Sequence, residues 1–121
     1  MDCHNLLLID DEDMVTLTFR EYLVREGCVV DSARDLQTAR RCLAGQSYST
    51  VWLDLQLTGV STADCLRFLS EARGAAPHAT IIAVSGYASD QVELAAGAAG
   101  ADRFLQKPFD ARAVAATMFA A

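Results

Sequence analysis

The stretch Thr50-Val51-Trp52-Leu53-Asp54 decides the fold of this chain, because it is a short apolar run that ends on a carboxylate. β-Branched and aromatic residues of this kind favour a strand, and burying an acid at the tip of a strand is costly if the core is its only purpose. Such a tip is typical of an open parallel α/β sheet, in which ligands bind just outside the carboxyl ends of the strands. We therefore expect a strand over residues 50–54 with a binding site at its end.

Three further strand-like runs also stop at polar residues. These are Leu6-Leu7-Leu8-Ile9 before Asp10 and Asp11, Ile81-Ile82-Ala83-Val84 before Ser85, and Phe104-Leu105-Gln106 before Lys107 and Pro108. Aspartate is common in turns, which explains a single acid. It does not explain carboxylates, a hydroxyl and an ammonium group at four separate strand ends, and this pattern indicates a functional site.

Helical segments alternate with these strands. The pattern predicts a helix over 13–26 ended by Gly27, a second capped by Asp35 and closed by Gly45, and a third that begins at a Ser61–Asp64 capping box. A further strand over 29–33, helices over 90–99 and 110–121, and strands over 80–84 and 103–106 complete the series. Five strands alternating with five helices predict an α/β, doubly wound (βα)5 fold with right-handed crossovers and helices on both faces of a parallel sheet.

Five such strands match the flavodoxin-like order 2-1-3-4-5. In this order the first and third strands are neighbours, so the sequence predicts that Asp10 and Asp11 lie beside Asp54.

Length and composition limit the class of protein. The chain has 121 residues, 52% of them hydrophobic, and we expect a single domain over 1–121. A net charge of −6 and a pI near 4.7 argue against direct binding to nucleic acid. No window approaches the roughly 20 apolar residues of a membrane span, and the N-terminus lacks a basic region typical of a signal peptide. The expected location is cytoplasmic, with the four widely spaced cysteines as small buried hydrophobic residues.

Three carboxylates in one cleft repel one another, so one must be protonated or a cation must lie among them. All-oxygen ligands of high charge suit Mg²⁺, which bridges to phosphate oxygens. Lys107 supplies a positive charge and Ser85 a hydroxyl for a phosphoryl group. An aspartate held in such a site can act as a nucleophile on phosphorus and form an acyl phosphate.

Four motifs carry a resemblance to a known family. They are L-L-L-I-D-D-E-D (residues 6–13), V-W-L-D-L-Q-L (51–57), A-V-S-G-Y-A (83–88) and G-A-D-R-F-L-Q-K-P-F (100–109). In this order and spacing, over essentially the whole chain, they resemble the receiver domains of bacterial two-component response regulators, including chemotaxis regulators.

The resemblance implies a role for each site residue. Asp54 would be the phosphoacceptor, and Asp11, Asp54 and the main-chain carbonyl of Gln56 would bind Mg²⁺, with Asp10 reaching it through water. Ser85 and Lys107 would contact the phosphoryl group, Phe104 would follow Ser85 as the aromatic switch, and the Lys107–Pro108 bond would be cis. Gln56 and Tyr87 would tune the lifetime of the acyl phosphate.

The same resemblance implies the partners. A histidine kinase or a histidine phosphotransfer protein would supply the phosphoryl group. The fourth helix, fifth strand and fifth helix would form the output surface. The domain would catalyse only its own phosphorylation and dephosphorylation, so it would not be an enzyme in the usual sense. Thr58 and Thr62 depart from the Pro and Gly common at these positions, without loss of a catalytic group.

Three alternatives remain at this point. An aspartyl-phosphate phosphatase would need a substrate pocket or cap, for which 121 residues leave no room. A nucleotide-binding Rossmann domain should read G-x-G-x-x-G at its first strand-to-helix turn, where this chain reads D-D-E-D. A pseudo-receiver would bind a partner without phosphorylation, although every side chain expected at the site is present.

Overall fold

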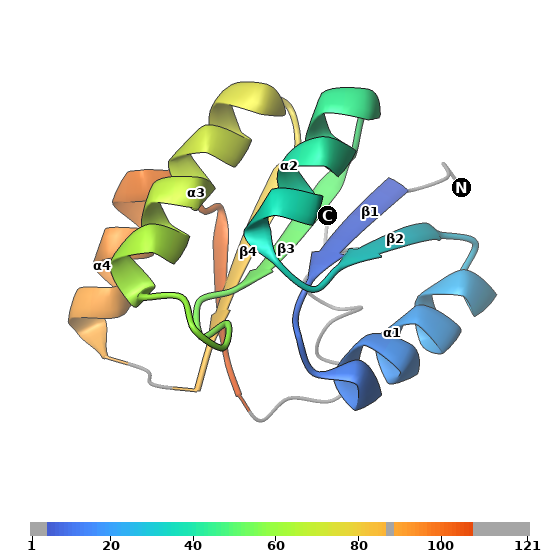
Figure 1. Ribbon diagram of the computed structural model, residues 1–121, viewed down its shortest axis with the longest axis horizontal. Helices are drawn as coiled ribbons and strands as arrows, with labels where there is room; N and C mark the ends of the chain where they lie inside the picture. The colour runs from blue at the N-terminus through green and yellow to red at the C-terminus, as the bar shows by residue number, and fades with distance from the viewer. Residues whose placement is uncertain (1–4, 87–88, 108–121) are drawn as a thin grey trace.

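The computed structural model describes residues 5–86 and 89–107, with the backbone alone for residues 13–16. Strands and helices alternate along this part of the chain (Figure 1). The strands are β1 (Asn5–Ile9), β2 (Val29–Ala33), β3 (Thr50–Asp54), β4 (Thr80–Ser85) and β5 (Arg103–Gln106), and the helices are α1 (Asp13–Arg25), α2 (Leu36–Gly45), α3 (Thr62–Ala75) and α4 (Asp90–Ala99). The helix predicted over 110–121, Tyr87 and Pro108 lie outside the described residues.

The strands form one parallel sheet in the order β2-β1-β3-β4-β5, which confirms the predicted fold class. Ile9 at the end of β1 pairs with Leu53, and Asp54 at the end of β3 pairs with Val84. The carboxyl ends of β1, β3 and β4 therefore meet at one edge of the sheet. This register determines which side chains can share a site.

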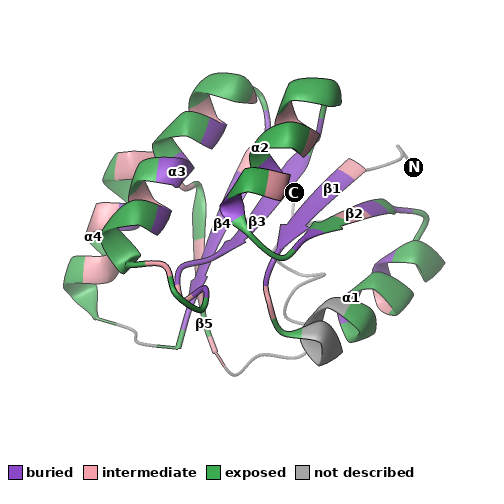
Figure 2. Ribbon diagram, viewed as in Figure 1, coloured by how far each residue is buried: buried purple, intermediate pink, exposed green. Residues whose placement is uncertain are grey.

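The sheet has an apolar layer on each face, because alternate residues of a strand point to opposite faces. Each layer packs against helices. On one face Leu7, Val51 and Ile81 belong to a cluster that includes buried residues of α2, α3 and α4. On the other face Trp52 packs edge-to-face against Phe19 of α1, with ring centroids 5.5 Å apart. The central strands β1, β3 and β4 are accordingly buried, whereas the edge strands β2 and β5 are partly exposed and the outer sides of the helices face solvent (Figure 2).

The helices begin and end where the local sequence predicts. The Asp35, Ser61 and Ser89 side chains accept hydrogen bonds from the main-chain N–H groups of Thr38, Asp64 and Val92, which satisfies a free donor at the start of α2, α3 and α4. Gly27 follows α1 with a φ of 90°, a conformation that glycine adopts without steric cost. None of the helices in the described part is long and apolar enough to cross a membrane.

Candidate functional site at the carboxyl edge of the sheet

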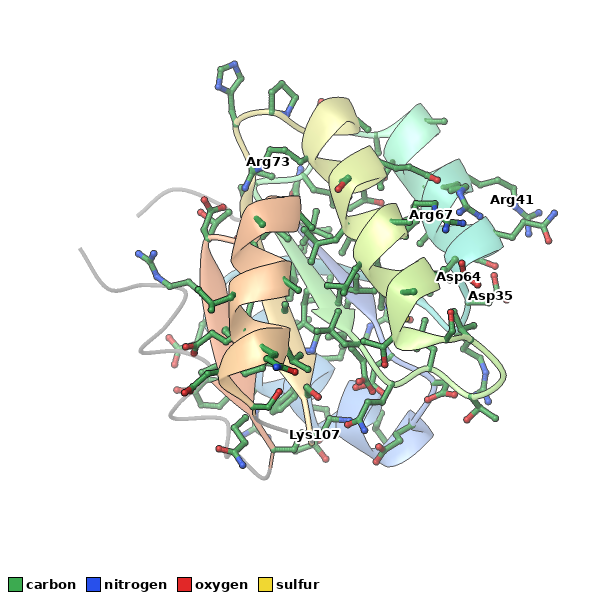
Figure 3. All side chains as sticks on the ribbon, turned by 90° about the vertical axis from the view of Figure 1, so that its left-hand side faces the viewer. Asp35, Arg41, Asp64, Arg67, Arg73 and Lys107 are labelled. Carbon is green, nitrogen blue, oxygen red and sulfur yellow. The ribbon has the colours of Figure 1, made fainter. Side chains whose placement is uncertain are left out.

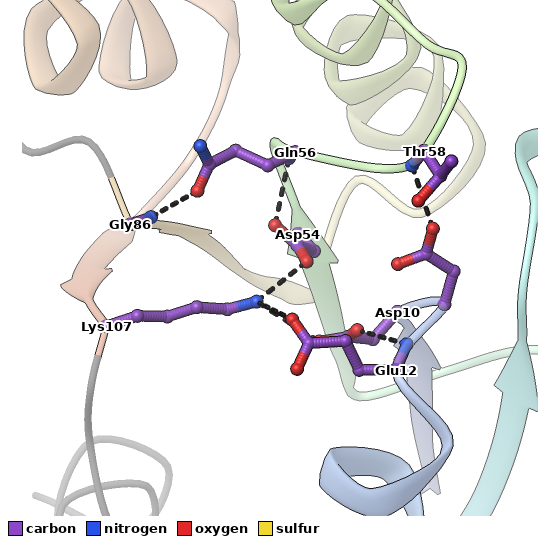
Figure 4. Close-up of polar contacts among 8 residues, drawn as sticks. Asp10, Glu12, Asp54, Gln56, Thr58, Gly86 and Lys107 are labelled. Carbon is purple, nitrogen blue, oxygen red and sulfur yellow. Dashed lines mark hydrogen bonds and ion pairs between the residues drawn. The ribbon is translucent and has the colours of Figure 1, made fainter.

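Four neighbouring strands each deliver a polar group to the carboxyl edge of the sheet. Asp10 follows β1, Asp54 ends β3, Ser85 ends β4, and Lys107 lies just beyond β5. Asp10, Asp54 and Ser85 are 1%, 1% and 2% exposed. The sequence predicted that these residues converge, and the order of the strands places all four at one edge of the sheet, where Figure 4 shows Asp10, Asp54 and Lys107.

Lys107 is the cation that links the acids. Its Nζ lies 2.9 Å from Asp54 Oδ2, 3.2 Å from Glu12 Oε1 and 3.8 Å from Asp10 Oδ2. Burial alone would lower the pKa of Lys107, but the hydrogen bond to Asp54 and the charge of Asp10 outweigh it and raise the pKa. The lysine therefore carries its positive charge at neutral pH, next to Asp54.

The Asp54 carboxylate is held through both of its oxygens. Oδ2 accepts the hydrogen bond from Lys107, and Oδ1 accepts a hydrogen bond of 2.9 Å from the main-chain N–H of Gln56. The side chain follows directly from a fully buried strand, so its position is set by the sheet and not by a free loop. A carboxylate fixed in this way is oriented before any reactant arrives.

The surroundings of the Asp10 carboxylate disfavour its negative charge. Its Oδ1 accepts a hydrogen bond of 2.9 Å from the Glu12 N–H, whereas its buried Oδ2 has no hydrogen-bond partner among the described residues. Burial raises the pKa of Asp10 to about 6; the Glu12 N–H opposes this rise and the negative charge of Asp54 adds to it. When Asp10 is ionised, its Oδ2 has no cation at hydrogen-bond distance among the described residues, because Lys107 Nζ is 3.8 Å away.

The acids meet the requirements of a small hard cation. Carboxylate oxygens of Asp10, Glu12 and Asp54 all lie within 4.8 Å of one another. The donors are oxygens of high charge, which Mg²⁺ prefers, and Asp10 Oδ2 is a buried acceptor that a cation would satisfy. The residues present therefore fit such an ion.

Asp11 and Glu12 make contacts that the sequence did not predict. Asp11 Oδ2 accepts a hydrogen bond of 2.8 Å from the Thr58 N–H, and the hydrogen bonds from Thr58 lower the pKa of Asp11. Its carboxylate thus ties the first strand-to-helix turn to the loop after β3. Glu12 approaches the cluster instead, and sequence reasoning missed it because an acid next to a helix start is also typical of a dipole interaction.

Gln56 and Gly86 connect the ends of β3 and β4. The Oε1 atom of Gln56 accepts a hydrogen bond from the Gly86 N–H (Figure 4). The Lys107 N–H in turn donates to the Ser85 carbonyl at 2.9 Å. Phe104 is half-buried against the α2–α3–α4 side of the sheet, beside Ala83 of β4. These contacts make the loop after β4 part of the site.

The fold and the site together define a flavodoxin-like domain with an acidic, lysine-bearing centre at the carboxyl edge of its sheet. The sequence model of the response regulator receiver domain matches residues 6–119. The chain therefore belongs to the receiver domains of two-component response regulators, a family of signalling domains, as its motifs indicated.

Relatives of known name are similar over most of this chain. Protein PetR of Rhodobacter capsulatus is 30% identical over 106 residues, which cover 88% of this chain and 43% of PetR. The nitrogen assimilation regulatory protein NtrX of Azorhizobium caulinodans is 31% identical over 108 residues, covering 89% of this chain and 24% of NtrX. The chain thus spans less than half the length of either relative.

Solved structures agree with this assignment. A response regulator from Burkholderia pseudomallei, with a phosphorylated aspartic acid, a calcium ion and citrate, has a TM-score of 0.86 at 28% identity, covering 93% of this chain and 65% of that one. A CheY-like receiver domain from Methanospirillum hungatei has a TM-score of 0.87 at 22% identity, covering 97% of this chain and 91% of that one. The second of these shows the shared fold alone.

Proposed function

We propose that this receiver domain accepts a phosphoryl group on Asp54, with Mg²⁺ bound, and that this changes a surface read by a downstream partner. The observation that carries the proposal is the position of Lys107 Nζ, 2.9 Å from Asp54 Oδ2 at the buried end of β3. The solved Burkholderia relative with a phosphorylated aspartic acid and a calcium ion supports the same chemistry.

The proposed reaction transfers a phosphoryl group from a phosphohistidine of the donor to the carboxylate of Asp54. An Asp54 oxygen forms the new P–O bond while the P–N bond to the donor imidazole breaks, and the imidazole leaves with the electron pair and takes up a proton from solvent. Lys107 balances charge on the reacting oxygens, and the Gln56 N–H keeps the carboxylate oriented. The preferred donor is a histidine kinase or a histidine phosphotransfer protein.

Mg²⁺ would neutralise charge that develops on the phosphoryl oxygens. The family resemblance implies Asp11, Asp54 and the Gln56 carbonyl as ligands, with Asp10 reaching the ion through water. Glu12 joins them as a candidate because its carboxylate lies in the same cluster as Asp10 and Asp54. The role of Asp11 requires its carboxylate to leave the Thr58 N–H or to share it.

The output would follow from the loop after β4. We expect Ser85 to bond the new phosphoryl oxygens, and Phe104 to adjust its packing beside α4. Three further expectations lie outside the described residues. They are the effect of Tyr87, with Gln56, on the lifetime of the acyl phosphate, the cis Lys107–Pro108 bond, and the part of the last helix in the output surface. The whole of residues 1–121 forms one receiver domain in this proposal. The proposed downstream partner is an output domain, in the same chain or in a separate protein. Relatives that are more than twice as long as this chain support it.

A pseudo-receiver that works without phosphorylation is not favoured, because Asp10, Asp54 and Lys107 are all in place and in contact. The proposed location is cytoplasmic, where a kinase would meet this domain.

Intact-protein mass after incubation with acetyl phosphate tests the proposal. We expect a gain of one phosphoryl group with Mg²⁺, and none with a chelator or in Asp54→Asn. Asp64→Asn, which removes an exposed acid of α3 (Figure 3), should still gain the group. Absence of any gain in the unaltered protein with Mg²⁺ contradicts the proposal.

A further inference from the structure

The side chain of Gln56 joins the two loops that enclose Asp54. Its main-chain N–H holds Asp54 Oδ1, and its side-chain Oε1 accepts a hydrogen bond from the Gly86 N–H. The contact between Gln56 Oε1 and the Gly86 N–H is called the Gln56–Gly86 bridge below. One residue therefore orients the candidate phosphoacceptor and at the same time holds the loop that follows Ser85.

The glycine at position 86 is explained by this bridge and not by backbone conformation. The described glycines with a positive φ are Gly27, Gly59 and Gly100, so the φ of Gly86 is open to residues with a side chain. A Cβ atom at position 86 would lie 2.9 Å from Gln56 Oε1, closer than carbon and oxygen normally approach. The small residue thus lets the glutamine side chain reach the main chain.

The bridge occupies a main-chain donor at the same edge of the sheet as Asp54. Asp54 pairs with Val84 across the two strands, so Gly86 lies two residues beyond the strand neighbour of Asp54, and Figure 4 shows its N–H bonded to Gln56 at the same edge of the sheet. A phosphoryl group brings oxygens of high negative charge, and hydrogen bonds to such oxygens are roughly twice as strong as those to a neutral amide. The amide oxygen of Gln56 is therefore a weak competitor for the same N–H.

We propose that Gln56 is a positioning residue that occupies the Gly86 N–H while Asp54 is unmodified and releases it to a phosphoryl oxygen when Asp54 is phosphorylated. The inference rests on the proposed function of Asp54. It differs from the expected effect of Gln56 on acyl-phosphate lifetime, because it concerns the resting state. Each phosphorylation must break the bridge, so the bridge slows phosphoryl uptake and holds the loop after β4 in its resting position.

Two variants open the bridge by different routes. Gln56→Ala removes the acceptor but keeps the main-chain N–H and carbonyl of residue 56. Gly86→Ala leaves Gln56 intact and displaces its Oε1 through the added Cβ. Gln46→Ala removes an exposed glutamine at the C-terminus of α2 and serves as the matched control.

The first measurement is the rate of phosphoryl uptake from acetyl phosphate at saturating Mg²⁺. A neutral hydrogen bond contributes modestly to stability, so we expect both opening variants to react about two- to tenfold faster than the unaltered protein. Gln46→Ala should react at the unaltered rate.

The second measurement follows the amide resonance of Gly86 by NMR, which a general loss of stability would not move selectively. In the resting protein, Gln56→Ala should shift this resonance and speed its hydrogen exchange. With Mg²⁺ and beryllofluoride, a mimic of the phosphoryl group, the Gly86 resonances of the unaltered protein and Gln56→Ala should converge.

The outcomes separate the two proposals. If the unaltered protein takes up neither phosphoryl group nor beryllofluoride, the proposed function is overturned and the competition for Gly86 with it. If the unaltered protein is phosphorylated but both opening variants react at its rate, or the resting Gly86 resonance ignores Gln56→Ala, only the bridge proposal is overturned.

Discussion

At the scale of single residues, the site is built from acids whose burial opposes their charge. Asp10 is 1% exposed, with one oxygen bonded to the Glu12 N–H and the other without a hydrogen-bond partner in the described part of the chain. Asp54, equally buried, has Lys107 and the Gln56 N–H. When no cation is bound, the buried negative charge of Asp10 therefore lowers the stability of the fold.

Replacing Asp10 by asparagine should stabilise the metal-free protein at pH 7.5. The folded pKa of about 6 lies above the ordinary value of 3.8, so Asp10 favours folding only when protonated. That contribution is full below about pH 4 and is lost as the pH rises through 6. We expect Asp10→Asn to raise the free energy of unfolding by about 1–2 kcal/mol at pH 7.5, after allowance for solvent screening, and to change it little at pH 4.

Chemical denaturation at the two pH values measures this effect. Glu21→Gln, which alters an exposed acid of α1, is the matched control and should change stability by no more than about 0.5 kcal/mol. A destabilised Asp10→Asn at pH 7.5 would show that the Asp10 carboxylate is better solvated than its surroundings indicate.

At the scale of elements, a second polar network holds the opposite end of the sheet, away from Lys107 (Figure 3). Arg73, near the end of α3, donates to the carbonyls of Ala79 and Gly100 and pairs with Asp102, which also accepts a hydrogen bond of 2.9 Å from the Ile81 N–H. One guanidinium thus joins α3 to the segments that enter β4 and β5. The network therefore fixes where β4 and β5 begin relative to α3.

Replacing Arg73 by methionine should destabilise the domain by about 2–3 kcal/mol, because buried carbonyls and the Asp102 carboxylate lose a charged donor. Arg67→Met is the matched control on the same helix. The Arg67 side chain is 74% exposed and pairs only with Asp64 among the described contacts, so its loss should cost less than about 1 kcal/mol. Thermal or urea unfolding of both variants checks the difference, and equal losses would contradict the anchoring role.

The helices and strands of the described part could be predicted from the sequence to within a residue or two. Apolar runs that stop at Asp10, Asp54 and Ser85 gave the strand ends, and Asp35 and Ser61 gave the helix starts, because these signals are local. The side-chain contacts were not local. The turn of Asp11 toward Thr58, the approach of Glu12 and the reach of Gln56 to Gly86 depend on strand neighbours and loop paths that no single stretch encodes.

At the scale of the whole molecule, the proposed cation site would couple the chemistry of the acids to the stability of the fold. An ion that binds the folded state alone stabilises it by an amount that grows with concentration, about 2.7 kcal/mol at a hundred times the dissociation constant. We expect Mg²⁺ to raise the melting temperature at pH 7.5. The rise should shrink as the pH falls through about 6, because protonation of Asp10 removes a charge from the cluster.

Melting curves over a range of Mg²⁺ concentration and pH test this coupling. Asp54→Asn should lose most of the rise, whereas Asp64→Asn should keep it. A melting temperature that ignores Mg²⁺ at every pH would contradict a cation site among these acids.

The contact between Lys107 and Glu12 has a consequence for how the molecule is made. The two side chains are 95 positions apart in the chain and meet at 3.2 Å. A growing chain that has emerged from the ribosome only as far as β4 carries the acids of the site without their lysine. Under the proposed function, only molecules whose β5 has already docked would place this lysine beside Asp54 and accept a phosphoryl group, so a half-synthesised copy would stay silent.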